Sequence, residues 1–355
     1  MKLIRGSNIL VLADFDGTRA NNFTLIRIFL AWSVLYGHSF AIASIPGVRD
    51  PLTQIFQGSI WIGEIAVNGF FALSGFLVTG SLIKRGAWDY AISRCLRIFP
   101  ALLLCVFFSV FLLGPLVTSL PVEEYLIDKN AWGYLTNSLA FFPMQWNLPG
   151  VFEDNPRTAV NGSLWTLTVE VRCYLILMVL GMFGLFRDRA TGNLAVVCLA
   201  AFAFFNYTDI PLLGHKEKWA RPAAYFLMGV VAYLNRERVV LNGRIALLAL
   251  ILVVVSFGKD WFDYVFAPSY IYLLFYLSYC PPHFKADEKI GDISYGIYIY
   301  AWPVQQLSMM MFPGTYPVFN IVTSSLLVIP IAWLSWHYVE KPTLAYKNRL
   351  SPVRA

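Results

Sequence analysis

The sequence predicts an all-α, polytopic integral membrane protein with about ten transmembrane helices and both termini in the cytoplasm. Its 355 residues are 58% hydrophobic and only 14% charged, whereas soluble domains average about 45–50% apolar and about 25% charged residues. One spanning helix needs about 20 apolar residues, and the chain holds enough for roughly ten. This composition excludes a soluble enzyme, a disulfide-stabilised scaffold and a disordered chain.

Ten apolar segments, separated by turn-forming or charged residues, predict the individual helices. They cover residues 23–43, 60–82, 96–118, 163–186, 193–208, 219–235, 243–258, 263–280, 291–312 and 318–340. The fifth, sixth and seventh are short for a span. We expect one transmembrane domain over 23–340, between a cytoplasmic N-terminal segment, 1–22, and a cytoplasmic C-terminal tail, 341–355.

The distribution of basic residues supports this orientation. With both termini in the cytoplasm, nineteen of the 27 Lys and Arg residues fall on the inner side and seven on the outer side, as the positive-inside rule requires. The net charge of +6 therefore reflects topology, and we expect no nucleic-acid partner. The five cysteines lie in or beside apolar runs without a CxxC pair, so we expect buried thiols and no metal site.

One long outer segment, about 119–162, separates the third and fourth apolar segments. Trp132, Trp146 and Pro149 lie in it among polar residues. Such a composition suits an interfacial or re-entrant lid over an outward-facing cavity. A disordered connector is the alternative, which the aromatic content disfavours.

Ionisable residues inside spans mark function by default, because they are costly there. Arg27 and His38 are eleven residues apart in the first apolar segment. Three helical turns bring them onto one stripe, separated by about 16 Å along the axis. This places a cation near the cytoplasmic end and an imidazole in the outer half. A structural histidine with satisfied hydrogen bonds is the alternative for His38.

The second apolar segment carries three polar residues, Glu64, Asn68 and Ser74. Glu64 and Asn68 are i,i+4 neighbours and so share a helix face in the outer half. The string LSGF around Ser74 resembles a serine-protease motif but lacks its first glycine. Close packing of small residues at Ser74 and Gly75 is the better interpretation than a nucleophile.

The third apolar segment begins with Arg94 and Arg97, which share a face at i,i+3. Ordinary positive-inside anchoring explains most arginines at such positions. A phosphate site is the sharper interpretation, because paired guanidiniums make bidentate bonds to phosphoryl oxygens. Arg27 lies at the same level and completes that site. In the fourth segment, Glu170 lies about 10 Å below the outer surface.

These residues together resemble the membrane-bound acyltransferase-3 family, whose members O-acylate sugars of bacterial surface and secreted glycans. The resemblance covers nearly the whole chain, and its features follow the family's order. They are Arg27 with His38, VNGFFALSGFLV at 67–78, Arg94 and Arg97 in RCLRIFP, LWTLTVE at 164–170, ISYGIYIYAWPV at 293–304 and HYVEKP at 337–342. Two positions depart: Asn68 stands where many relatives have Asp, and Ala301 where many have His.

The resemblance implies a multi-pass protein of the bacterial inner (plasma) membrane that takes acetyl-CoA, or another acyl-CoA, from the cytoplasm. Arg94 and Arg97, with Arg27, would hold the donor's phosphates. The acceptor would be a carbohydrate: O-antigen, capsule, an exopolysaccharide or a lipo-oligosaccharide. The implied partners are this acceptor and membrane lipid, with no metal cofactor.

We expect His38 to act as the general base, since the pKa of imidazole lies near the operating pH. Glu170 or Glu64 would orient His38 or bind the sugar. Asn68 and aromatic side chains, Trp146 and Trp165, would contact the acceptor. Two other classes stay open at this point: a transporter or flippase for a glycan or acyl intermediate, and an intramembrane serine hydrolase using Ser74.

Overall fold

The computed structural model describes residues 10–347 except 16–17, 19–20, 57, 59, 142–143 and 206–215. Within these ranges all regular structure is helical, apart from one isolated antiparallel bridge between Val11 and Val240. The all-α class is therefore confirmed. The ends of the cytoplasmic segments expected at 1–22 and 341–355 lie outside the described residues.

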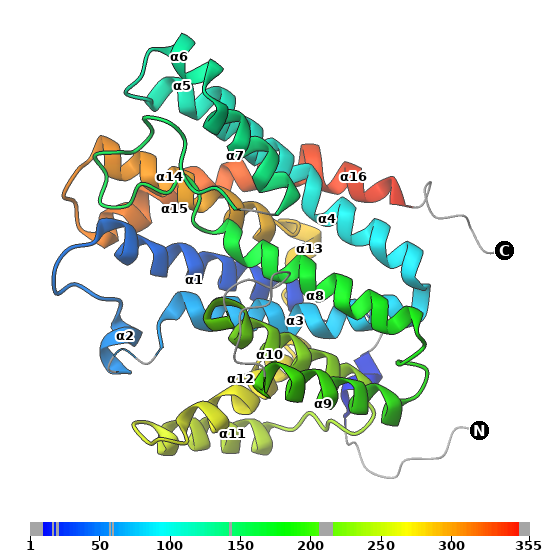
Figure 1. The fold of residues 1–355 in the computed structure, drawn as a ribbon. Coiled ribbons are helices and arrows are strands. Elements are labelled where there is room, and N and C mark those ends of the chain that lie inside the picture. The colour runs from blue at the N-terminus through cyan, green and yellow to red at the C-terminus, as the bar shows by residue number, and fades with distance from the viewer. Residues whose placement is uncertain are drawn as a thin grey trace. The chain divides into compact units, whose positions relative to one another are not determined.

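Each of the ten apolar segments contains a helix (Figure 1). The ten helices are α1 Phe23–Ala43, α3 Ile62–Arg85, α4 Ala87–Phe108, α8 Leu164–Met182, α9 Arg189–Phe205, α10 Lys216–Leu234, α11 Gly243–Ser256, α12 Phe262–Tyr279, α14 Ser294–Met311 and α15 Pro317–Ser335. Shorter elements between and beyond them are η1 Leu12–Phe15, α2 Pro51–Ile55, η2 Ser109–Leu113, α5 Gly114–Val117, α6 Val122–Ile127, α7 Lys129–Ala140, α13 Ala286–Lys289, η3 Trp336–Glu340 and α16 Lys341–Ala345.

Five helical stretches of the described chain are long and apolar enough to cross a membrane. They are α1, α3, α8, the continuous stretch Ala87–Val117 and the continuous stretch Pro317–Ala345. The apolar helices at Arg189–Phe202 and Gly243–Ser256 are shorter. Crossing by all ten helices, and the cytoplasmic placement of both termini, stay predictions.

The contacts divide the chain into two compact units. The first comprises residues 1–26, 68–84 and 175–289 and includes α9 to α13. In it, a Cβ on Gly75 would lie 2.1 Å from the carbonyl oxygen of Phe226, and one on Gly229 would lie 2.1 Å from that of Ala72. Only glycine permits such backbone approach. The packing role expected for the small residues around Ser74 is thus confirmed at Gly75.

The second unit comprises residues 27–67, 85–174 and 290–355 and includes α14. Nearly every residue of α14 is buried, including Gln305, Gln306 and three tyrosines. Beside it, α15 buries Asn320 and Ser324 while exposing large apolar side chains such as Leu326 and Leu327. Polar residues inward and apolar residues outward are typical of a helix that faces lipid.

Two helices of this unit widen into a π-helical turn before a proline. Pro115 and Pro342 follow η2 and η3 and lack the N–H that would bond the carbonyl four residues earlier. A side-chain hydroxyl donates to a carbonyl in each widened turn: Tyr125 to Val110 at 2.8 Å, and Thr343 to Val339. Such π turns occur frequently at functional sites, and η3 supplies Glu340.

Candidate functional site

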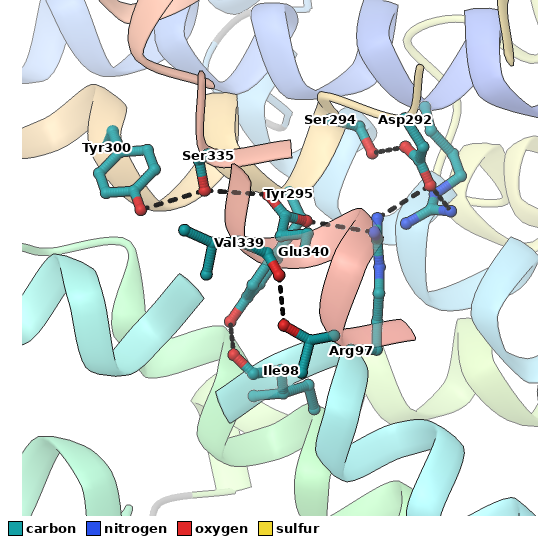
Figure 2. A network of polar contacts seen from close by, with 11 residues as sticks. Arg97, Ile98, Asp292, Ser294, Tyr295, Tyr300, Ser335, Val339 and Glu340 are labelled. Carbon is teal, nitrogen blue, oxygen red and sulfur yellow. Dashed lines mark hydrogen bonds and ion pairs between the residues drawn. The ribbon is translucent and has the colours of Figure 1, made fainter. Parts of the chain in front are cut away.

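Asp292 joins two of the arginines that the sequence singles out. Its Oδ2 atom lies 2.6 Å from Nη1 of Arg27 on α1 and 2.9 Å from Nη2 of Arg97 on α4. Its Oδ1 atom accepts a hydrogen bond from the Ser294 hydroxyl at 2.5 Å (Figure 2). The turn before α14 therefore links the first and third apolar segments through one carboxylate.

Glu340 is the second carboxylate on Arg97. Its Oε2 lies 3.2 Å from Nη1 of Arg97, and its Oε1 accepts from the Ser335 hydroxyl at 3.1 Å. Ser335 in turn lies 3.2 Å from the hydroxyl of Tyr300, and Figure 2 shows this chain of contacts running from α14 to Asp292. We call Arg27, Arg97, Asp292 and Glu340 the arginine network.

The arginine network balances its own charge. Its two guanidiniums face two carboxylates, and the side chains of Arg97, Asp292 and Glu340 are only 13%, 14% and 1% exposed. Burial raises the pKa of Asp292, but the adjacent Arg27 and Arg97 and the bonds from Ser294 outweigh it and hold that pKa below its usual value. Buried charges that are paired and hydrogen-bonded in this way brace helices together.

Arg94 lies one helical turn before Arg97 and has different surroundings. Its guanidinium lies 5.7 Å from the centre of the Tyr174 ring, and its buried Nε has no hydrogen-bond partner. The Tyr174 hydroxyl donates to Glu170. Glu170 is thus linked through Tyr174 to the arginine side of the site. Of the two arginines expected on one face, Arg97 is paired with carboxylates, whereas Arg94 forms no ion pair within the part of the chain that the structure describes.

His38 lies between two indole rings. The centroid of its ring is 4.7 Å from that of Trp302 on α14, in an edge-on arrangement, and 5.8 Å from that of Trp61. The side chain is buried, and its Nδ1 has no hydrogen-bond partner. The role expected for Glu64 or Glu170, to orient His38 or bind the sugar, stays a prediction. We call His38, Trp61 and Trp302 the His38 site.

Glycines make room for both indoles. A Cβ on Gly37 or Gly63 would lie 2.7 Å and 2.0 Å from Trp61, and one on Gly162 would lie 2.7 Å from Trp302. The ring of Trp302 is further fixed by a 2.9 Å hydrogen bond from its Nε1 to the carbonyl of Ala159. The three glycines therefore let the two indole rings lie close to the backbone, next to His38.

The long segment 119–162 is folded over the described part of its length, which omits 142–143. It contains α6 and α7. Its last part, around residues 157–159, forms hydrogen bonds with α14 and α1. Nε2 of Gln306 donates to the carbonyls of Arg157 and Ala159 at 2.7 Å each, and Nε of Arg157 donates to that of Ala41 at 3.2 Å. The described part of this segment is therefore folded and contacts α14 next to the His38 site. The lid that its composition predicts stays a prediction.

The remaining candidates lie apart from the ring contacts of His38. Glu64 lies in the first turn of α3, and its backbone N–H donates to the carbonyl of Trp61 at 3.1 Å. Asn68, one turn further, is 1% exposed, and neither its Nδ2 nor its Oδ1 has a hydrogen-bond partner. Trp146 and Trp165 are half-buried and make no ring contact with His38.

Four residues of this site were not among the predicted site residues: Asp292, Glu340, Trp61 and Trp302. Glu340 and Trp302 do lie in the quoted strings at 337–342 and 293–304. Asp292 and Glu340 each stand at one end of an apolar segment, where a charge is ordinary. Trp61 and Trp302 are ordinary core aromatics by spacing. The available signal was charge: partly buried Arg27 and Arg97 require carboxylate partners, and Asp292 and Glu340 are carboxylates at the ends of apolar segments. No group of three or more metal-ligating side chains occurs among the described residues.

Comparison with known proteins adds the following. A family profile described as an acyltransferase domain matches residues 21–337. An O-acetyl transferase of Shigella phage Sf6 is 28% identical over 354 residues, covering 94% of this chain and 98% of its own. Nodulation protein 10 of Rhizobium leguminosarum bv. viciae is 28% identical over 367 residues, with 93% and 95% covered. "Putative peptidoglycan O-acetyltransferase YrhL" of Bacillus subtilis strain 168 is 24% identical, with 79% of this chain and 50% of that protein covered. No solved structure matches.

Proposed function

Because the chain belongs to the acyltransferase-3 family, we propose that it transfers an acyl group, in the simplest case acetyl, from acyl-CoA to a hydroxyl group of a carbohydrate. An O-acetyl transferase that aligns with almost the full chain supports O-acetyl transfer. The single observation that carries the mechanism is His38, a buried imidazole without a partner on Nδ1, held between two indoles.

His38 is the general base of this reaction. Neutral imidazole accepts the proton of the acceptor hydroxyl as its oxygen attacks the thioester carbonyl. The new C–O bond forms, the C–S bond breaks, and the proton passes from the imidazolium to the leaving thiolate. A direct transfer of this kind needs no covalent acyl-enzyme.

The acceptor binds beside the His38 site. Indole rings offer flat apolar faces with a polar edge, which suit the C–H faces and hydroxyls of a sugar, and Trp61 and Trp302 already flank the imidazole. The carboxylate of Glu64, in the same unit as the His38 site, supplies a further hydrogen bond to the acceptor. One relative is named for peptidoglycan O-acetylation, which supports a glycan acceptor.

The donor binds at the arginines. Arg94, which forms no ion pair among the described residues, contacts the donor's phosphates, and the arginine network lies one helical turn away at Arg97. The helical rise between Arg27 and His38 is about 16 Å, a length that the pantetheine arm of CoA covers. The donor's nucleotide and its thioester thus reach the two ends of α1.

The test is acetyl transfer by purified protein from radiolabelled acetyl-CoA to a glycan fraction. His38→Gln keeps the size of the side chain and removes the base, so kcat should fall by about 10²- to 10⁴-fold with little change in KM for acetyl-CoA. His283→Gln is the matched control, since the hydrogen bond that the structure gives the His283 ring goes to the carbonyl of Tyr279. A His38→Gln protein with near-normal kcat would exclude the general base.

A further inference from the structure

Two glutamines follow one another on α14 and have different partners. Gln305 and Gln306 are both fully buried. Nε2 of Gln306 donates to carbonyls of the outer segment. Nε2 of Gln305 instead donates to two atoms of α1, the carbonyl oxygen of Leu35 at 2.8 Å and the hydroxyl oxygen of Ser39 at 2.7 Å. Ser39 is the residue after His38, so Gln305 is bonded to α1 directly beside the proposed base.

Gln305 is the middle member of a chain of hydrogen bonds that runs from α15 to α1. Nδ2 of Asn320 on α15 donates to the main-chain carbonyl of Gln305 at 2.9 Å. At the other end, the Ser39 hydroxyl accepts from Gln305 and donates to the carbonyl of Leu35 at 3.2 Å. Both amide hydrogens of Gln305 are thereby used. These directional bonds fix the position of α1 against α14.

The position of the His38 ring depends on the backbone of α1. No described residue forms a hydrogen bond with its Nδ1, and the ring packs between Trp61 and Trp302. Trp302 precedes Gln305 by three residues, so the two side chains share a face of α14. This face therefore meets α1 twice, through the indole at His38 and through the amide at Ser39.

An apolar side chain would occupy the place of Gln305 at lower cost. Oε1 of Gln305 is buried and has no hydrogen-bond partner, and a buried polar atom without a partner is destabilising. Leucine has a comparable size and carries no such atom. A glutamine at this position therefore indicates a task for its amide hydrogens that packing alone does not perform.

We propose that Gln305 is a positioning residue for His38: its amide holds α1 so that the imidazole stays beside Trp302, where the acceptor hydroxyl is deprotonated. This inference rests on the proposed function. A misplacement of a catalytic group by about 1 Å lowers the rate by about 100-fold. Binding of the donor does not depend on the Gln305 amide, so loss of the amide should lower kcat and leave KM for acetyl-CoA unchanged.

The test compares one substitution in two backgrounds, with purified full-length protein and radiolabelled acetyl-CoA. Gln305→Leu should lower kcat by about tenfold to hundredfold in the wild-type background, with KM for acetyl-CoA within about twofold of its wild-type value. In the His38→Gln background it should add no further loss to the residual rate, because a residue that acts through His38 then has no base to position. A merely structural substitution lowers the rate in both backgrounds.

A matched pair of smaller substitutions gives a second measurement. Ser39→Ala removes one of the two acceptors of the Gln305 amide and should lower kcat by about fivefold. Ser308→Ala makes the same change on α14, where the Ser308 hydroxyl lies 2.7 Å from that of Thr323, and should keep the wild-type kcat.

Three results would overturn the inference. A wild-type kcat in Gln305→Leu, or an equal proportional loss in both backgrounds, excludes positioning of His38. If Gln305→Leu gives no folded protein, equal kcat values in Ser39→Ala and Ser308→Ala exclude it. Wild-type protein that does not transfer from acetyl-CoA refutes the proposed donor, and a near-normal kcat in His38→Gln refutes the proposed base. These last two failures are distinct because neither involves a change at Gln305.

Discussion

Coupling between Arg97 and Glu340 should be large, because this pair is buried and geometrically constrained. Their charged atoms lie 3.2 Å apart, and the side chains are 13% and 1% exposed. At an effective dielectric constant near 20, two charges at this distance attract by roughly 5 kcal/mol. Arg97 also forms an ion pair with Asp292. Removal of Glu340 therefore leaves Arg97 attracted to a second carboxylate. We therefore expect a coupling free energy of about 2–3 kcal/mol.

A double-mutant cycle measures this coupling. Arg97→Met and Glu340→Leu, alone and together, would be unfolded by sodium dodecyl sulfate in mixed micelles, with tryptophan fluorescence as the readout. Each single variant strands a buried charge and should lose about 3 kcal/mol of unfolding free energy, whereas the double variant should lose less than the sum.

An exposed pair in the same chain provides the control. Arg221 and Asp263 are 3.5 Å apart, with side chains 44% and 62% exposed, and their coupling should be at most about 0.5 kcal/mol. If the effects of Arg97→Met and Glu340→Leu add to within about 0.5 kcal/mol, the arginine network does not brace α4 and the reasoning is refuted.

Three further predictions concern the fold and the site. Gly75→Val should abolish the folded protein in size-exclusion chromatography, because its Cβ would lie 2.1 Å from the carbonyl oxygen of Phe226; a monodisperse peak at wild-type yield would contradict this. Trp302→Ala should raise KM for the acceptor by about tenfold with little effect on KM for the donor, since it empties one side of the His38 site; an unchanged acceptor KM would exclude Trp302 from acceptor binding. Asp292 has a lowered pKa, so its stabilising contribution is complete above the ordinary carboxyl pKa and is lost as pH falls through the lowered value. Unfolding midpoints between pH 7 and pH ~3 should show an acid-side loss that is smaller in Asp292→Asn, and an identical loss in both proteins would contradict this.

Helix positions could be predicted from the sequence because apolar runs and their interruptions are local signals. Every one of the ten apolar segments contains a helix. Hydropathy is a weaker signal for α14 than for α15, since α14 carries three tyrosines and two glutamines. Those side chains lie inside the protein, where they form hydrogen bonds to other helices. For example, Nε2 of Gln305 donates to the Ser39 hydroxyl oxygen on α1 at 2.7 Å. A helix enclosed by others needs no lipid-facing surface, so its composition is that of a protein core.

The candidate site could be predicted only in part, because its contacts join distant residues. Spacing alone put Arg94 and Arg97 on one face, but the carboxylates that distinguish them stand at 292 and 340. The aromatic residues expected near the acceptor were Trp146 and Trp165, whereas the rings on His38 are Trp61 and Trp302. Which indole meets which helix depends on the glycines that admit it, and this is set by tertiary packing.

The most direct test of O-acyl transfer by His38 is mass spectrometry of surface glycan from cells with and without the gene. Deletion should remove mass increments of one acetyl group, and the wild-type chain or His283→Gln should restore them, whereas His38→Gln should not. Unchanged acetylation in the deletion strain, or full restoration by His38→Gln, would contradict the account.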